Sequence, residues 1–192
     1  MVKMGGEKKY NGYRAFSYLE PGFDYKEFKL VKHPRIEPYY VPLSKSEEER
    51  YQGLVEGSTL VDLHEHPVLW PEDMKDVPEL HHLGRQFTAY EALSSSRLDC
   101  VFENMMDGME YVTSYSGWKW TDVIHDIGIR LSDIAHQDTI VHCRKVQDIV
   151  DTQKNGKIAM VFCLESAKPI ENELDRIDVL LRSRYQEHGN LL

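Results

Sequence analysis

Residues 62–67, which read Asp-Leu-His-Glu-His-Pro, are the part of the sequence best suited to chemistry. Successive side chains of a β-strand point to opposite faces, so Asp62, His64 and His66 are expected on one side of a strand. Neutral imidazole is a common zinc ligand, and two rings at this spacing can reach one ion at about 2.0–2.1 Å. The pattern therefore predicts the beginning of a metal site. The alternative is that both histidines are structural residues that pack against neighbours or cap backbone groups and bind no metal.

A carboxylate that suits such a site stands much later in the chain. Glu165 directly follows the apolar run at residues 157–164. At the end of a parallel strand it would share a rim with His64 and His66, and a glutamate there can bridge two ions that hold a hydroxide between them. Its alternative role is to cap the helix that follows. Asp62, two residues before His64, is expected to accept a hydrogen bond either within the strand or from the ring of a histidine that binds the metal.

Three short apolar runs are expected to be the strands that position these side chains. The first continues from the β-prone residues 58–61 into the histidines and ends at Pro67, which cannot donate to a sheet ladder. The second is predicted at residues 98–103 and the third at residues 157–164. Strands that alternate with helical patterns indicate an α/β fold with a parallel sheet, where chemistry gathers at the carboxyl ends of the strands.

Apolar periodicity and capping signals predict four helices. The first starts near Ser46, whose spacing to Glu49 fits a capping box, and ends before Gly57. The others are predicted at residues 120–136, with Val123, Ile124, Ile127, Leu131 and Ile134 on the inner face, at residues 144–154, and at residues 170–185, with Leu174, Ile177, Leu180 and Leu181 inward.

The first 43 residues show neither the helical nor the strand period, and their aromatic side chains are expected to anchor an extended arm over the rest of the chain. Two parts are therefore expected. Residues 1–57 form an amino-terminal arm and lead-in helix, and residues 58–192 form a metal-binding β/α unit.

Composition narrows the class of partner. Acidic residues outnumber basic ones by 32 to 23, and the net charge of −9 disfavours nucleic acid and anionic membrane surfaces. A small-molecule or peptide ligand is expected instead. The first nine residues contain no apolar run suited to a signal peptide, and no membrane-length apolar segment follows, so a cytoplasmic location is expected. Cys100, Cys143 and Cys163 lack metal-type spacing and are expected to be reduced, mostly buried thiols.

With these features in place, the chain resembles the renal or membrane dipeptidase family of metallopeptidases, within the wider amidohydrolase group. The strand Val-Asp-Leu-His-Glu-His-Pro at 61–67 looks like the family's first metal strand. Residues 148–165 look like its helix, its Gly-Lys-Ile-Ala turn and its strand ending in a glutamate. The Ile-Glu-Asn-Glu-Leu sequence at 170–174 resembles the opening of its next helix. The resemblance covers roughly residues 44–185.

The resemblance implies a TIM-like barrel, two zinc ions and hydrolysis of a dipeptide or small amide by a bridging hydroxide. By position, His64 and His66 would be ligands of the first ion and Glu165 the bridge. Imidazole and carboxylate also suit manganese, iron or nickel, so other divalent metals fit the same set of ligands.

A whole barrel takes about 250 residues, so the expected fold is the first half of a barrel, because the family's later ligands belong to strands beyond Leu192. A truncated chain is one explanation. The other is a split enzyme completed by a second copy, as a homo-oligomer, or by a second polypeptide. Two further alternatives remain: a non-catalytic barrel-derived binding or structural protein, and a phosphoesterase of the polymerase-and-histidinol-phosphatase type, whose first motif Asp62, His64 and His66 also fit.

Overall fold

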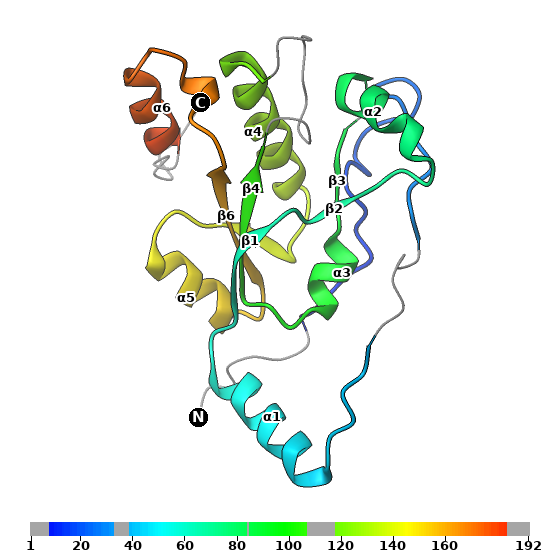
Figure 1. The fold of residues 1–192 in the computed structure, drawn as a ribbon, viewed down its shortest axis with the longest axis vertical. Coiled ribbons are helices and arrows are strands. Elements are labelled where there is room, and N and C mark those ends of the chain that lie inside the picture. Colours follow the sequence, from blue (N-terminus) through cyan, green and yellow to red (C-terminus); the bar gives the residue numbers. More distant parts are fainter. Residues whose placement is uncertain (1–7, 33–38, 84, 107–117, 184–192) are drawn as a thin grey trace.

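The computed structural model describes residues 8–32, 39–83, 85–106 and 118–183. Strands and helices alternate along most of this length (Figure 1). The strands are β1 (Val61–Glu65), β2 (Val68–Leu69), β3 (Phe87–Thr88), β4 (Cys100–Met105), β5 (Ile140–His142) and β6 (Ile158–Leu164). The α-helices are α1 (Lys45–Gly57), α2 (Val77–Leu83), α3 (Tyr90–Ser95), α4 (Trp120–Ile134), α5 (Val146–Lys154) and α6 (Asp175–Ser183), with short 3-10 turns at Met74–Asp76 and Lys168–Ile170.

Four strands form one parallel sheet in the order β1-β4-β6-β5, and β2 and β3 form a small antiparallel pair. The α/β class and the parallel sheet predicted from the sequence are therefore confirmed. The three predicted strands are the adjacent strands β1, β4 and β6. β5 was not predicted because three residues are too few to show a period, and it lies at the edge beyond β6. The described residues show no closure of this sheet into a barrel.

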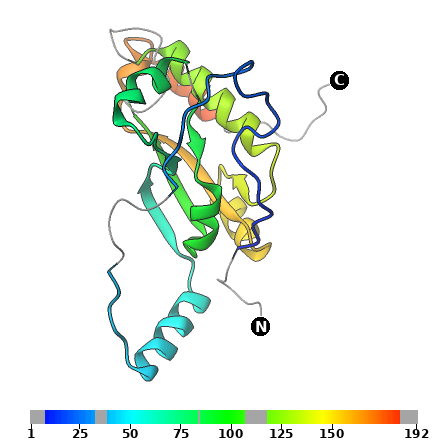
Figure 2. The same cartoon turned by 90° about the vertical axis from the view of Figure 1, so that its right-hand side faces the viewer.

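One face of the sheet carries the main core. Val101 and Met105 of β4 and Met160 of β6 pack there with Val123 of α4. The amino-terminal arm covers the same face, and Figure 2 shows it running beside α4. Phe16, at the centre of the arm, is 1% exposed and belongs to this cluster. The arm expected from the sequence is thus part of the core.

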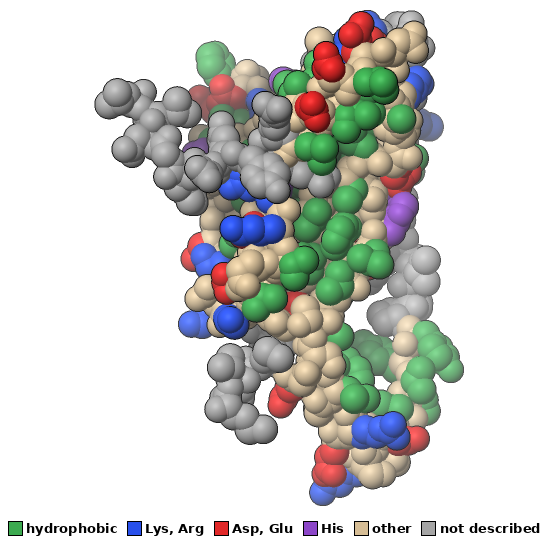
Figure 3. Space-filling model, turned by 90° about the vertical axis from the view of Figure 1, so that its left-hand side faces the viewer, with side chains coloured by type: hydrophobic (Ala, Val, Ile, Leu, Met, Phe, Trp, Pro, Cys, Tyr) green, Lys and Arg blue, Asp and Glu red, His purple; other side chains and the backbone are tan. Residues whose placement is uncertain are grey.

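The opposite face is covered only in part. α5 packs over its amino-terminal end, where Cys100, Cys143 and Ala159 are buried. Figure 3 views the molecule from this side and shows hydrophobic side chains gathered in a band over the sheet. Val61 on β1, which pairs with Cys100 on this face, is 44% exposed, so a large apolar side chain faces solvent in a part of a parallel sheet that is normally covered.

The four helices predicted from the sequence are present, but their boundaries and caps differ in part from the prediction. The capping box of α1 uses Ser44 and Glu47, two residues before the predicted pair Ser46 and Glu49, so the predicted pair was wrong. α5 ends where predicted, at Asn155 followed by Gly156, whose φ of 70° suits glycine.

Two helical faces also differ from prediction. In α4 the predicted inner residue Ile124 is 40% exposed. Buried polar side chains hold that helix instead: Asp122, Asp126, Arg130 and Asp133. The predicted helix at 170–185 is shorter than expected, since α6 begins at Asp175 and Leu174 is 75% exposed. The predicted end of that helix lies outside the described residues. None of the described helices is long and apolar enough to cross a membrane.

Asp133 of α4 fastens the arm to the core. Its carboxylate accepts hydrogen bonds from the Tyr13 hydroxyl at 2.6 Å, the Phe16 backbone N–H at 2.8 Å and the Tyr90 hydroxyl at 2.7 Å. Asp133 is 1% exposed, and the bonds connect the arm, α3 and α4. Phe16 has a φ of 59°, which is uncommon for a residue with a side chain. The bond to its N–H helps to hold that conformation.

We expect Asp133→Asn to lower the free energy of unfolding by about 2–4 kcal/mol, because one amide cannot replace a carboxylate that accepts three bonds in the interior. Urea unfolding followed by circular dichroism measures this. The matched control is Asp138→Asn, which changes an exposed carboxylate that also holds the arm, by accepting from Asn11 at 3.0 Å. It should change stability by less than about 0.5 kcal/mol. Equal effects of the two substitutions would contradict the role given to Asp133.

The same contacts predict a fall in stability at high pH. Burial, reinforced by contact with Asp133, raises the pKa of both Tyr13 and Tyr90 above their ordinary value of 10.0. Above that pH the unfolded chain loses phenol protons that the folded chain keeps, so the folded state binds more protons and becomes less stable as pH rises. Urea unfolding between about pH 8 and pH 11 should show this decline, and Tyr90→Phe should flatten it. An unchanged slope in that variant would exclude Tyr90 as a source.

Candidate metal centre

β1 reaches its carboxyl end through an irregularity. Asp62 pairs with Val101 of β4, but Glu65 pairs with Glu103. β1 therefore advances by three residues over a stretch in which β4 advances by two, which is a β-bulge. Such a bulge reverses the alternation of side chains. Asp62 and Glu65 therefore share a face, and His66, which follows Glu65, emerges on the other. The sequence prediction that Asp62 and His66 lie on one face of the strand is therefore wrong.

Side chains and backbone groups stabilise this irregular end of β1. Asp62 Oδ1 accepts from the His64 backbone N–H at 2.9 Å, and Glu65 Oε1 accepts from the His66 N–H at 2.8 Å. The Asn104 side-chain amide donates to the Leu63 carbonyl at 3.3 Å. The bulge is thus held by short local bonds and by one contact from the neighbouring strand.

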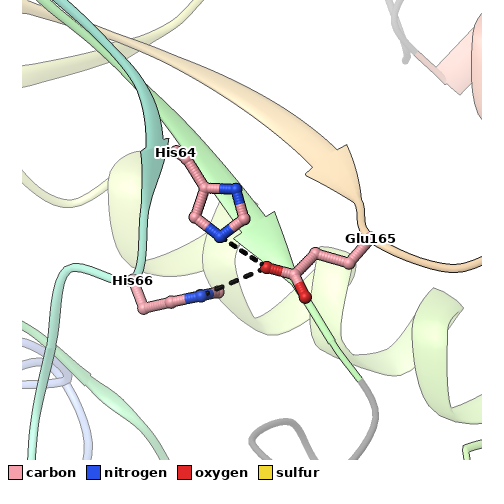
Figure 4. A group of neighbouring side chains, drawn as sticks. All are labelled: His64, His66 and Glu165. Carbon is pink, nitrogen blue, oxygen red and sulfur yellow. Dashed lines mark ion pairs between the residues drawn. The ribbon is translucent and has the colours of Figure 1, made fainter.

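Glu165 arrives at the same rim from β6. β4 and β6 are in register up to Met105 and Leu164, and the Glu165 backbone N–H continues the ladder by donating to the Met105 carbonyl at 3.1 Å. Its carboxylate reaches across the end of β4 to β1. Figure 4 shows the side chains of His64, His66 and Glu165 pointing toward one another. The sequence prediction that these three residues share one rim agrees with this geometry.

The distances are close to those of a coordination site. Glu165 Oε1 lies 2.7 Å from His64 Nε2 and 3.2 Å from His66 Nε2. Donors bound tetrahedrally at about 2.0–2.1 Å stand about 3.3–3.4 Å apart, so a small outward shift of His64 would admit an ion. The three ligand atoms lie within 4.8 Å of one another, and this is the one group of three or more such residues among those that the structure describes.

The three side chains differ in their exposure to water. The side chains of His66 and Glu165 are 26% and 24% exposed, whereas that of His64 is 64% exposed. The two imidazole rings stand perpendicular, with centroids 5.2 Å apart. His66 and Glu165 are therefore partly covered by the protein, whereas His64 faces solvent. An ion held by the three side chains would keep an open coordination position on the solvent side.

The surroundings of His66 Nδ1 differ from those of a typical ligand histidine. His66 Nδ1 is buried and has no hydrogen-bond partner among the described residues. Ligand histidines usually donate from this nitrogen to a carboxylate or a carbonyl. The one bond that the structure gives Asp62 near the site goes to the His64 backbone, so Asp62 supports the strand and its expected contact with a ligand ring stays a prediction.

Other candidate groups lie elsewhere. Glu103, at the end of the predicted second strand, is 2% exposed and pairs with Arg130 of α4 on the covered face. Cys100 and Cys143 are buried, and burial raises the pKa of the Cys100 thiol to about 12. Such thiols are poor nucleophiles and poor ligands at neutral pH. No sequence pattern points to Asn104, because a single amide that supports a bulge has no spacing pattern of its own.

The fold and the rim define an α/β protein with a cluster of two histidines and one glutamate at the carboxyl end of a parallel sheet. In comparisons with known proteins, no family model, no curated protein and no solved structure matches this chain. The geometry of the site is therefore the basis for any functional assignment.

We expect the protein to bind one zinc ion per chain, measured by isothermal titration and by elemental analysis of gel-filtered protein. His66→Ala should weaken binding by more than the roughly 10–100-fold that follows loss of an outer-shell partner, because it removes a ligand. His136→Gln is the matched control. It changes a histidine at the end of α4 that stacks on Tyr18 and is not in the cluster. Equal affinity in both variants would show that the ion binds elsewhere.

Proposed function

We propose that this chain carries the metal centre of a hydrolase of the membrane dipeptidase type, and that it acts on the amide bond of a dipeptide or a similar small amide. The observation that carries the proposal is the convergence of His64 Nε2, His66 Nε2 and one oxygen of Glu165 on the carboxyl rim of the sheet. Enzymes built on parallel β/α units place their chemistry at this rim.

The order of the strands is compatible with the proposed family. β1, β4 and β6 lie side by side in the order in which they occur along the chain, although β5, which comes between β4 and β6 in the sequence, lies at the far edge. β5 pairs only with Ile158 to Met160, so it lies beside the amino-terminal half of β6 and leaves the other half without a described strand on that edge. The helices of a barrel all lie on its outer side, whereas α4 and α5 pack on opposite faces of this sheet. We therefore propose that β5 and α5 are additions and that β1, β4 and β6, with α4 outside them, belong to the barrel.

His64, His66 and Glu165 would hold the ion, and zinc suits this set of nitrogen and oxygen donors, as do manganese, iron and nickel. When bound, such an ion lowers the pKa of water and polarises a carbonyl. The described residues supply ligands for one ion, and the two-ion centre that the resemblance implies needs further ligands.

Glu165 has a second role in the proposal. Its Oε1 faces both imidazoles, and its other oxygen is turned away from them (Figure 4). This second oxygen can accept a proton from the attacking water. The proton then passes to the amide nitrogen as the carbon–nitrogen bond breaks, which releases an amine and a carboxylic acid.

A non-catalytic role is the second candidate. The contact of 2.7 Å between His64 and Glu165 closes as a hydrogen bond without an ion, so the same three residues could simply tie the ends of β1 and β6 together. The two candidates differ in whether the cluster binds metal and in whether the bound metal supports hydrolysis.

The test is hydrolysis of a panel of dipeptides, measured as released amine. Activity should vanish on removal of metal by a chelator and return with zinc or manganese. Glu165→Gln should lower kcat/KM by about 10³-fold or more, since it removes both a ligand and a proton acceptor. Glu173→Gln, an exposed glutamate after β6, is the matched control and should leave activity unchanged. Tight metal binding without hydrolysis of any dipeptide would refute the catalytic proposal and leave the metal site standing.

A further inference from the structure

Two apolar surfaces of this molecule face solvent in the described residues. The first, the open face, is the part of the sheet that α5 does not cover, and Figure 3 shows it as a hydrophobic band. Val61 pairs with the buried Cys100 and shares its face, and Leu63 follows in the irregular stretch of β1 between Asp62 and Glu65. They are 44% and 69% exposed. Phe102 and Val161, which pack toward α5, are only half-buried.

The second surface is α1 with the segment that leads into it. In Figures 1 and 2 this helix stands apart from the sheet, at the end of the molecule where β1 begins. One of its residues, Val55, is buried. Tyr51 and Leu54 lie three residues apart on the helix and so share a side, and they are 46% and 58% exposed. Leu43, just before the helix, is 45% exposed.

The two surfaces match in size. α1 has 13 residues and is therefore about 20 Å long. The four parallel strands, spaced by about 4.8 Å, make a sheet about 15–20 Å wide. β5 lies beneath α5, so the open face comprises β1, β4 and the carboxyl-terminal part of β6 and is about 10–15 Å wide. α1 is long enough to lie across these three strands.

The surfaces also match in charge. α1 carries four glutamates against one lysine and one arginine. Residues 144–157, which contain α5 and border the open face, carry four basic side chains against two aspartates. The chain as a whole has a net charge of −9, so a local basic border is a departure from the rest of the surface. An acidic helix is attracted to this border, and a generally acidic partner would be repelled by the remainder.

We propose that two copies of this chain form a symmetric dimer in which α1 of each copy lies across the open face of the other. One molecule presents both the acidic apolar helix and the apolar face with a basic border, so a twofold arrangement buries both surfaces twice. Tyr51 and Leu54 then pack on Val61, Leu63 and Val161 of the partner. Each sheet gains cover on the face that its own helices leave open, beneath the rim that holds Glu165.

The first experiment is sedimentation equilibrium of the full chain, whose monomer is 22.4 kDa. The wild type should have twice that mass at micromolar concentration. Leu54→Glu on the helix and Leu63→Glu on the open face should each raise the dissociation constant at least about 100-fold, because each buries a charge in an apolar contact. Leu174→Glu, at an apolar residue of 75% exposure outside both surfaces, is the matched control and should dimerise normally.

A charge exchange tests the orientation. Lys145→Glu with Lys154→Glu, on the basic border, should weaken the dimer about tenfold, and so should Glu49→Lys with Glu56→Lys on α1. All four together should restore it. Circular dichroism checks that each variant folds. A monomer at every concentration would overturn the proposal. A dimer insensitive to either leucine substitution, or one that the charge exchange does not restore, would also overturn it, since another surface or another occupant would then be responsible.

Discussion

A parallel sheet has to be covered on both faces, because its strands carry apolar side chains on both sides. This chain meets the requirement unevenly. On one face α4 and the arm bury a continuous core, and the arm contributes Phe16 from a segment with no regular structure of its own. Buried carboxylates tie that segment down: Asp133 binds it from α4, and Asp99 pairs with Lys8 near the amino end of the sheet. The arm therefore does the work that a helix usually does in an α/β fold.

The same sheet determines where the candidate site lies. His64 and Glu165 are far apart in the chain, yet the parallel ladders from β1 to β4 and from β4 to β6 bring the ends of their strands to one rim. The bulge in β1 then decides which side chains leave the rim on the face of Glu165. A regular strand would have kept Asp62 and His66 together. Cluster geometry thus depends on one extra residue in a short strand, held by Asn104 and by local bonds of Asp62 and Glu65.

The features of the fold and the site that could be predicted are those that depend on local sequence patterns. Apolar runs identified β1, β4 and β6, and the strand-end positions of His64, His66 and Glu165 placed them on one rim. Short pieces without a period were missed, such as β5 and the β2–β3 pair. The inward face of α4 was partly wrong because buried ion pairs and hydrogen bonds, such as Arg130 with Glu103, replace apolar contacts there. The bulge was missed because alternation was assumed to persist to the end of β1. The error on α4 comes from tertiary contacts that override a local pattern, whereas the short strands contain too few residues to show one.

The positions of the imidazole protons distinguish the two candidate roles of the cluster, as a metal site and as a hydrogen-bonded tie between β1 and β6. As it stands, Nε2 of each ring lies within hydrogen-bond distance of Glu165, so each ring can carry a proton there. An ion at the centre requires both Nε2 lone pairs, which moves the remaining proton of each neutral ring to Nδ1. In His66 that nitrogen is buried and has no acceptor among the described residues, and an unsatisfied buried donor costs about 1–3 kcal/mol. Metal binding must therefore either overcome this cost or move His66 until Nδ1 meets water or a backbone carbonyl. His64, with most of its side chain exposed, has no such cost because its Nδ1 can reach water. The more buried histidine would therefore be the weaker ligand of a bound ion, and the affinity for that ion would depend on how far the irregular end of β1 can move.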